Sequence, residues 1–519
     1  MTLFSSTAFS FIVGTLICAL IYNFSARQRE LRADDQIAAA NGCLPLKKWN
    51  STWPLGLDLL VKAFRYDRRQ QILKFFLDVV DKSGTTFEQN LLFARGIDTI
   101  DPQNIQALLS TQFTDFGLGL RPPTFYPLMG SGIFTQDGAQ WRHSRELLRP
   151  QFMTNRFTNF EQICNAVDNL ISSVPDDNAV DLKPLFFRLT FETTLFLLFG
   201  QHLPTLKSEG ITGQESDFAN AFNLGQDYLA KRGRLGDFYW LLSGKEFRKA
   251  CRICHEFVDR AVQRALDSAT NKDSGTKTEP YTFIDALIEE TRNPKVLRDQ
   301  CLNILLAGRD TTACCLTWTL RLLVQHPRAL SKLRAEIRDT VGVGPGSSAP
   351  TITNVKTLPY LSLVIKEVLR LYPSVPVNSR AATKTTTLPT GGGPAGTAPI
   401  LVRKGEAVGY CVYAMHRRRD IYGADADEFR PERWENDALK DVGWGYLPFN
   451  GGPRICLGQE FALLEAGYTI VRLLQTFEII GQAEGCRMEE RIGEERQVLT
   501  LVVSCGEGCV VRMRRYKEM

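Results

Sequence analysis

Strong net charge, a dense cysteine framework and paired histidines are all missing from this sequence of 519 residues. The 62 basic and 57 acidic residues leave a formal net charge of +5, and the longest basic run is only 417–419. Nucleic-acid-binding proteins usually have a stronger basic bias, so this class is excluded. The 13 cysteines are scattered and odd in number, which predicts reduced thiols and a mostly cytosolic chain.

Motifs of metal-dependent and nucleophilic hydrolases are missing too. The five histidines have neither HExxH nor other paired spacing; they are His143, His202, His255, His326 and His416. Cys251 and Cys254 form one CxxC pair without a second, which favours two packed thiols over a zinc site. The glycines at 342–346 follow a helical pattern rather than a strand, which excludes a dinucleotide-binding loop, and no GxSxG motif occurs.

Charge is also absent from residues 2–26. Within them, residues 3–22 have about the 20-residue length that one membrane-spanning helix needs, although five of them are serine or threonine. Basic residues follow this segment instead of preceding it; they are Arg27, Arg29 and Arg32. This order favours an uncleaved anchor over a cleaved signal peptide.

The position of these arginines predicts a single span in the endoplasmic reticulum membrane, with the rest of the chain in the cytosol. The expected organisation is a transmembrane anchor in residues 1–26, a linker with a Pro-containing hinge in 27–58, and one large domain in 59–519. The sequons at Asn23 and Asn50 would then stay unused.

Beyond the hinge, most of the chain has helical periodicity. Apolar spacing predicts helices at 59–82, 146–173, 182–199, 247–267, 296–325 and 358–371. Short strand signals lie between 380 and 412 and near 497–503 and 509–513, and 342–350 and 390–399 have the composition of flexible inserts. The predicted fold class is mainly α with small β-sheets, in a single large domain without internal repeats.

One cysteine lies in a motif that carries chemistry. Residues 449–458 are FNGGPRICLG, a full match to F-x-x-G-x-R-x-C-x-G through Phe449, Gly452, Arg454, Cys456 and Gly458. This loop resembles the haem-binding loop of the cytochrome P-450 superfamily, in which the cysteine is the axial ligand of the haem iron. A glycine-rich turn with a free cysteine would not need five fixed positions in ten.

The residue types suit a thiolate that faces a flat macrocycle. Glycines let the backbone approach closely, and backbone N–H groups near the sulfur hold it ionised. Arg454 offers a positive charge to a haem propionate. The residues after Cys456 continue as a helix, so we expect the sulfur near a helix N-terminus, which favours the anion.

Residues 307–312, AGRDTT, lie inside the long helix predicted at 296–325. Gly308 and the two threonines are poor helix formers, and the Thr311 hydroxyl can bond to the Ala307 carbonyl, which frees backbone groups for a ligand or water. The segment resembles the oxygen-activating groove of the family, which implies that Thr311 binds the dioxygen and Asp310 relays protons. On residue types alone, a core helix that tolerates threonine fits equally well.

Three residues match a structural set of the family. Glu367 and Arg370 share one helix face at i,i+3 spacing, and FRPERW at 429–434 supplies Arg433. The resemblance implies that the three lock the proximal side of the fold and have no catalytic role.

Three more residues resemble the partners of the haem propionates. Trp141 and Arg145 share a helix face at i,i+4 spacing, which a plain surface pair would also show. Arg380, just after a proline-flanked segment, resembles a further partner.

Residues 116–152 resemble the fungal branch that hydroxylates alkanes and fatty acids at the chain end, with HSR at 143–145 and LRPQF at 148–152 as its distinctive segments. Family position implies a substrate pocket lined by Phe125, Leu128, Phe134, Ala307, Val375, Val377, Leu499 and Thr500. Such an apolar lining also suits a polyketide or terpenoid. A tailoring enzyme of a fungal secondary-metabolite pathway is therefore the alternative.

The resemblance implies a monooxygenase that inserts one atom of O2 into a C–H bond of a lipophilic substrate, with haem b as cofactor. No flavin or nicotinamide domain is present, so electrons from NADPH are expected through a separate NADPH–cytochrome P-450 reductase, with cytochrome b5 as a further partner. Arg142, Arg145 and Arg149 form a basic helix face that suits an acidic reductase surface or simply solvent. A haem sensor would keep Cys456 but would not need Asp310 and Thr311.

Overall fold

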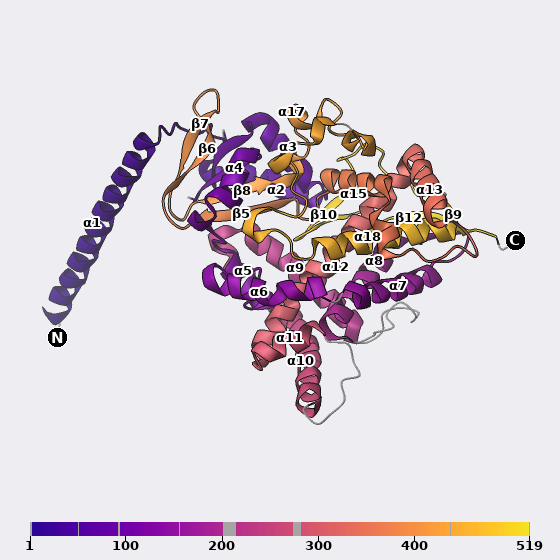
Figure 1. Ribbon diagram of the computed structural model, residues 1–519. Helices are drawn as coiled ribbons and strands as arrows, with labels where there is room; N and C mark the ends of the chain where they lie inside the picture. Colours follow the sequence, from indigo (N-terminus) through magenta and orange to yellow (C-terminus); the bar gives the residue numbers. More distant parts are fainter. Residues whose placement is uncertain are drawn as a thin grey trace.

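The computed structural model describes residues 3–49, 51–91, 94–154, 156–200, 214–272, 282–435 and 437–517. In these residues helices dominate and the strands form four small sheets, as the predicted fold class requires. The first helix, α1 (Leu3–Ala40), extends alone from a broad body (Figure 1).

The body contains long helices joined by short ones. Its α-helices are α2 (Leu57–Arg68), α3 (Ile72–Ser83), α4 (Pro102–Gln106), α5 (Arg121–Met129), α6 (Gly138–Thr154), α7 (Arg156–Ser173), α8 (Leu182–Phe199), α9 (Gln214–Arg234), α10 (Lys245–Lys272), α11 (Phe283–Glu290), α12 (Pro294–Gln325), α13 (Pro327–Val341), α14 (Ile352–Lys356), α15 (Pro359–Leu371), α16 (Val412–Met415), α17 (Arg419–Tyr422) and α18 (Gln459–Thr476). Single helical turns are η1 (Pro54–Gly56), η2 (Ala107–Thr111), η3 (Phe113–Asp115), η4 (Gly236–Leu241), η5 (Pro431–Trp434), η6 (Asp437–Leu439), η7 (Gly443–Gly445) and η8 (Gly452–Arg454).

The largest sheet has the strand order β1-β2-β8-β5-β3, and only its β2–β8 pair is parallel. A second sheet has the order β4-β12-β9, and two hairpins, β6–β7 and β10–β11, stand separately. The strands are β1 (Thr86–Leu91), β2 (Ala94–Thr99), β3 (Phe116–Gly117), β4 (Asn178–Asp181), β5 (Val377–Ala382), β6 (Thr386–Gly392), β7 (Ala398–Val402), β8 (Ala407–Cys411), β9 (Phe477–Gln482), β10 (Gln497–Leu499), β11 (Val503–Cys505) and β12 (Val510–Arg515).

Helix α12 runs through both hydrophobic clusters of the core. Its first half, up to Leu306, belongs to the cluster formed with α9, α10 and α11, and its second half, from Ala313, belongs to the larger cluster with α15 and α18. With 32 residues it is about 48 Å long. Its middle, residues 307–312, therefore lies where the two clusters meet.

Local sequence fixes the ends of α12 and of its neighbour α8. The Asn293 side chain accepts hydrogen bonds from two N–H groups of the first turn of α12, and Pro294 occupies the first helical position. Asp181 caps α8 in the same way, and Gly200, at φ +65°, ends it. The Thr190 hydroxyl of α8 donates to the Arg309 carbonyl of α12 at 2.6 Å, which locks the two helices together.

One of the predicted helices is divided in the structure, and another contains a residue that the structure does not describe. The stretch expected at 59–82 forms α2 and α3, because Gln70 adopts a φ of +57° between them. The stretch expected at 146–173 lies in α6 and α7, on either side of residue 155, which is outside the described residues. The other four predictions are confirmed as α8, α10, α12 and α15.

The expectation of flexible inserts is wrong for both glycine-rich stretches. Residues 390–399 close the β6–β7 hairpin, and the Leu44 N–H donates to the Pro399 carbonyl at 2.9 Å. Residues 342–350 lie against α18, where the Gln475 amide donates to three backbone carbonyls between 341 and 348. Each stretch is held because its backbone groups have partners in another segment.

Helix α1 continues past the predicted anchor. Residues 27–40 of the expected linker are helical, and the irregular connector begins at Asn41. Arg403, after β7, lies 3.5 Å from Asp34 and 3.8 Å from Asp35, which ties the end of α1 to the body. None of the described helices combines the length and the hydropathy that crossing a membrane requires.

Candidate functional site

The loop of Cys456 is closed by its own backbone. The Cys456 N–H donates to the Phe449 carbonyl at 3.0 Å, which folds the motif around η8. Gly452 has a φ of +65°, and a Cβ there would overlap the carbonyl oxygen of Leu109. Glycine is therefore required at this position. Gly458 caps α18, and its carbonyl accepts from the Ala462 N–H at 2.9 Å.

Cys456 is exposed, although many protein atoms surround its thiol. Burial raises the pKa of Cys456, whereas the Gly458 N–H and the Arg145 guanidinium lower it. Helix α18 begins at Gln459, so its N-terminus adds positive potential near the sulfur. The backbone N–H group and the helix N-terminus predicted near the sulfur are both present.

Arg145 and Arg454 both lie close to the indole ring of Trp141. Their guanidinium carbons lie 5.9 Å and 4.4 Å from its ring centroid. Arg145 donates to the Ile455 carbonyl at 2.9 Å, and Arg454 to the Asp137 carboxylate at 2.6 Å. The two residues predicted on α6 are therefore held against the cysteine loop.

Arg380 approaches the same region from β5. Its Nη1 donates to the Ser379 carbonyl at 2.7 Å, but its Nε is buried without a hydrogen-bond partner. Arg121, the first residue of α5, donates to the same carbonyl at 3.2 Å and also to the Asn378 side chain. The cluster therefore gains a fourth arginine that the sequence did not predict.

The clustered positive charge perturbs these guanidinium groups. Burial, with Arg380 and Arg454 nearby, lowers the pKa of Arg121 to about 9. Burial and Arg380 lower that of Arg454 to about 10, against the opposing effect of Asp137. A bound dianion would relieve both this charge and the unpaired Nε of Arg380. The residues therefore fit the two propionates of a haem, with Cys456 as its thiolate ligand.

Helix α12 has one open face at its middle. From Cys301 to Leu323 every side chain is buried except those at Ala307, Gly308 and Thr311. The Thr311 hydroxyl donates to the Ala307 carbonyl at 2.7 Å, the bond predicted from the sequence. The Thr311 hydroxyl therefore lies on the half-buried part of an otherwise buried helix, and the helical backbone is continuous there.

Asp310 is buried and already paired. Its carboxylate accepts from the Arg309 guanidinium at 3.0 Å and from the Gln226 side chain. Burial raises the pKa of Asp310, and Arg309 opposes that effect. Arg309 also donates to Asn223 of α9 at 2.8 Å. The acid predicted to relay protons is thus bound to partners that lead toward α9.

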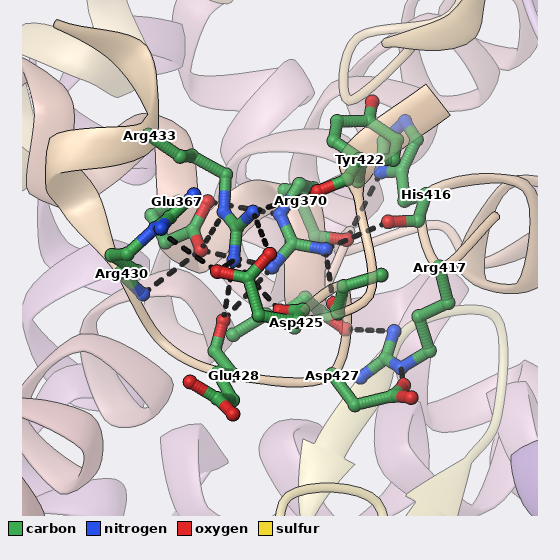
Figure 2. Close-up of polar contacts among 12 residues, drawn as sticks. Glu367, Arg370, His416, Arg417, Tyr422, Asp425, Asp427, Glu428, Arg430 and Arg433 are labelled. Atoms are coloured by element: carbon green, nitrogen blue, oxygen red, sulfur yellow. Dashed lines mark hydrogen bonds and ion pairs between the residues drawn. The ribbon is translucent and has the colours of Figure 1, made fainter. Parts of the chain in front are cut away.

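Glu367, Arg370 and Arg433 form one buried network (Figure 2). Two Arg370 nitrogens donate to the Glu367 carboxylate at 2.9 Å, and the Arg433 Nε donates to it at 2.7 Å. The guanidinium groups of Arg370 and Arg433 also donate hydrogen bonds to backbone carbonyls between residues 416 and 428. The three predicted residues therefore join α15 to the segment that precedes the cysteine loop.

The predicted pocket residues divide between the two core clusters. Phe125, Leu128 and Phe134 belong to one cluster, and Val377 and Leu499 belong to the other. Ala307 lies at the boundary, Thr500 is half-buried, and Val375 is 39% exposed. Leu128 has no exposed surface and packs toward Gly225 of α9, so it lies behind the wall of any pocket.

Sequence reasoning missed Arg121, Asp137 and the Arg309–Asp310 pair. Arg121 meets Asn378 across 257 residues, and Asp137 meets Arg454 across 317. Contacts between residues so far apart in the sequence cannot be predicted from a local pattern. The one available signal was the arginine beside Asp310 in AGRDTT, because adjacent opposite charges inside an apolar helix require pairing when buried.

Known proteins resemble this chain throughout. A family model described as Cytochrome P450 matches residues 53–499. A protein of Arthroderma benhamiae named Cytochrome P450 is 72% identical over 509 residues, covering 98% of this chain and 99% of the relative. Cytochrome P450 52A13 of Debaryomyces hansenii is 42% identical over 475 residues, covering 89% and 91%. A crystal structure of the cytochrome P450DA heme domain has the same fold, with a TM-score of 0.74 at 20% identity, covering 92% of this chain and 99% of that one.

Proposed function

This chain belongs to the cytochrome P450 family, and from that premise we propose that it hydroxylates long-chain alkanes or fatty acids at or near the chain end. Membership makes the protein a haem-thiolate monooxygenase that acts on a lipophilic substrate and takes electrons from NADPH through a reductase. The chain-end hydroxylation and the role of each residue are the proposed part.

Haem supplies the oxygen chemistry when it is bound. We assign Cys456 as its axial ligand, in a loop shaped by Phe449, Gly452 and Gly458. The propionates fall to the arginine cluster, which consists of Arg121, Arg145, Arg380 and Arg454 with Trp141. The unpaired Nε of Arg380 and the lowered pKa of Arg121 support this assignment.

Proton delivery falls to Thr311 and Asp310. The Thr311 hydroxyl lies on the open part of α12, so it can hydrogen-bond a small ligand there. Asp310 can relay a proton when its carboxylate turns away from Arg309, takes up a proton from water and passes it on. Its raised pKa supports this role, because a carboxyl whose pKa lies nearer to neutrality holds a proton more readily.

The substrate class rests on the resemblance of residues 116–152 to the fungal branch that hydroxylates alkanes and fatty acids, and the likeness to the yeast relative named Cytochrome P450 52A13 over most of both chains supports it. The apolar character of the predicted lining agrees with it, since Phe125, Phe134 and Val377 all keep partly exposed apolar surface. Selectivity for the chain end requires the pocket to hold the substrate end-on, with the weaker C–H bonds further along kept away from the iron.

The test is product analysis by mass spectrometry with the full-length protein, a P450 reductase and NADPH. Long-chain alkanes and fatty acids should give products hydroxylated at or next to the terminal carbon, and Cys456→Ala should give none. A wild-type protein with a normal carbon-monoxide spectrum that oxidises no aliphatic chain would contradict the substrate class. That result would favour a polyketide or terpenoid substrate.

We also propose that α1 anchors the protein in the endoplasmic reticulum membrane, with residues 59–519 as the cytosolic catalytic domain. Apolar side chains of α1 are widely exposed, among them Phe11 at 78% and Tyr22 at 73%. Exposed Arg142 and Arg149 on α6 provide a basic surface beside the cysteine loop. This surface suits an acidic face of the reductase or of cytochrome b5.

A further inference from the structure

His416 lies between the Glu367 network and the start of the cysteine loop. It follows α16 directly, has no exposed surface, and its ring stacks on Tyr446 with centroids 5.2 Å apart. Figure 2 shows it beside Arg370 at the edge of the network. No role was assigned to it above, yet both of its ring nitrogens have backbone partners.

The two hydrogen bonds fix the state of the imidazole. The Leu447 N–H donates to Nε2 at 2.8 Å, so Nε2 carries no proton. Nδ1 lies 3.0 Å from the Arg370 carbonyl oxygen, so Nδ1 carries the proton and donates. A protonated ring would lose the bond to Leu447, and burial accordingly lowers the pKa of His416 to about 3.

The contact with Arg370 runs in both directions. The Arg370 guanidinium donates to the His416 carbonyl at 2.8 Å while the imidazole donates to the Arg370 carbonyl. The same guanidinium is bound to Glu367. His416 is therefore a rigid part of the network. Through its Nε2, which accepts from the Leu447 N–H, it connects the network to residue 447.

Leu447 begins the segment that ends at Cys456. Two residues after Leu447, the Phe449 carbonyl accepts the hydrogen bond from the Cys456 N–H. The hydrogen bond at Leu447 therefore fixes residues 447–449. The Phe449 carbonyl in this segment holds the Cys456 N–H. A side chain that replaces His416 must offer an acceptor to Leu447 and a donor to Arg370 at the same time.

We propose that His416 is a positioning residue for Cys456, in that its neutral imidazole transmits the rigid geometry of the Glu367 network to the thiolate loop. This inference rests on the proposed assignment of Cys456 as the haem ligand. It predicts that loss of His416 loosens thiolate ligation in a protein that still folds and still contains haem.

The test compares three variants of the full-length, haem-loaded protein. His416→Leu removes both ring bonds at similar volume, and His416→Gln keeps one donor and one acceptor. The control is His326→Leu, because the His326 ring also packs on an aromatic side chain, Phe429, but its Nδ1 lies 2.8 Å from the carbonyl of Leu322, only four residues earlier in the chain. Circular dichroism and haem content establish that each variant is folded and loaded.

The readout is the carbon-monoxide difference spectrum of the reduced protein. We expect His416→Leu to lower the ratio of thiolate-type to non-thiolate absorbance by about tenfold, since a buried donor at Leu447 loses its acceptor. His416→Gln should recover most of the ratio, and His326→Leu should match the wild type. A folded, loaded His416→Leu protein with the wild-type spectrum would overturn the proposal.

If His416→Leu does not fold, amide hydrogen exchange of the wild-type protein tests the positioning role of His416 instead. The Leu447 amide should exchange as slowly as amides of α15, and exchange at the rate of an exposed loop would overturn the proposal. Cys456→Ala separates this inference from the function it rests on. If that variant keeps the thiolate-type band, the ligand assignment fails; if only His416→Leu keeps it, the positioning role alone fails.

Discussion

Buried charge is the feature that the individual residues of this site share. Burial, and after it the neighbouring guanidinium groups, lower the pKa values of Arg121 and Arg454, and burial raises the pKa of Asp310. A buried charge raises the free energy of the folded state unless an opposite charge or a hydrogen-bond partner lies beside it. The site is therefore built for a ligand that brings negative charge.

Replacement of Arg380 should affect the haem-free and haem-loaded protein in opposite directions. Arg380→Met removes one of the crowded charges, so the apoprotein should unfold at a higher temperature than the wild-type apoprotein. The same variant should retain haem about tenfold more weakly, because a charge-assisted contact to a propionate is lost. Thermal unfolding of the apoprotein and haem transfer to an acceptor protein measure the two effects. A change of the same sign in both would contradict the assignment.

Thr311 has a close internal control. Thr311→Ala should keep haem and NADPH oxidation but shift the electrons from product toward peroxide, since a positioned proton donor contributes about 10²–10⁴-fold to its step. Thr317 donates to the Ala313 carbonyl at 2.7 Å with the same backbone geometry, but it is buried. Thr317→Ala should therefore leave coupling unchanged. Equal product-to-NADPH ratios in both variants would remove Thr311 from the proton path.

The neutral state of His416 makes stability depend on pH. Below the ordinary histidine pKa of about 6.5 the unfolded chain binds a proton that the folded protein excludes until about pH 3. The free energy of unfolding should therefore decrease as the pH falls below about 6.5, by up to about 1.4 kcal/mol per pH unit from this group. Urea unfolding at several pH values should show a shallower slope for His416→Gln.

At the scale of elements, local signals determined what could be predicted. The predicted range 182–199 agrees with α8 at both ends, because Asp181 caps its start and Gly200 ends it. The predicted range 296–325 begins within two residues of α12, because Asn293 and Pro294 mark the start of that helix. The break between α2 and α3 has no such signal, since Gln70 is neither glycine nor proline. Strand β3 was missed for a related reason, because its partner β5 lies far along the chain, whereas β1 and β2 pair with each other and were missed although they are close in the sequence.

The site could be predicted only as far as motifs reach. Cys456, Thr311 and the Glu367 set lie in short patterns that the family shares. Arg121 and His416 depend on partners that only the folded chain brings near, namely Asn378 and Leu447. The pairing of Asp310 with Arg309 was signalled only by their adjacency in the sequence, because periodicity does not set the direction of a side chain on a helix that is buried on nearly every side.

Helix α1 is the element whose removal has the plainest expected result. Deletion of residues 1–32 should move most of the protein from microsomes to the soluble fraction, because the exposed apolar side chains of α1 are lost. The deletion leaves Asp34, Asp35 and the contact between Leu44 and Pro399 in place, so haem content should not change. Alkaline carbonate extraction of the full-length protein is the matched experiment. Full-length protein in the soluble fraction, or glycan on Asn50, would contradict the proposed topology.

At the scale of the whole molecule, two hydrophobic clusters are joined by a few elements. Helix α12 crosses both, and the Glu367 network binds α15 to the segment before the cysteine loop. Both connections are buried, so water cannot replace the contacts that a substitution removes there. Stability of the haem loop and of the entire fold should therefore fail together.

Arg433→Leu tests this coupling. It leaves the Glu367 carboxylate with one cationic partner instead of two and should lower the free energy of unfolding by about 3–5 kcal/mol. Arg430 is the matched control, since it pairs with Asp425 from the surface and is half-exposed. Arg430→Leu should change stability by about 0–1 kcal/mol. Denaturant unfolding followed by both circular dichroism and haem absorbance should give coincident midpoints, and separate midpoints would contradict joint failure.

The close approach of α8 and α12 makes two positions depend on each other. A Cβ at Gly308 would lie 2.5 Å from the Thr194 hydroxyl oxygen, and that hydroxyl is itself bound to the Thr190 carbonyl at 2.6 Å. Alanine at 308 is therefore disfavoured while threonine occupies 194, and alanine at 194 would remove the two closest atoms and leave only its Cβ, at 3.3 Å. The two sites form one epistatic pair beside the open face of α12. A mutant library that varies residue 308 alone would discard substitutions that the fold accepts when both positions change together.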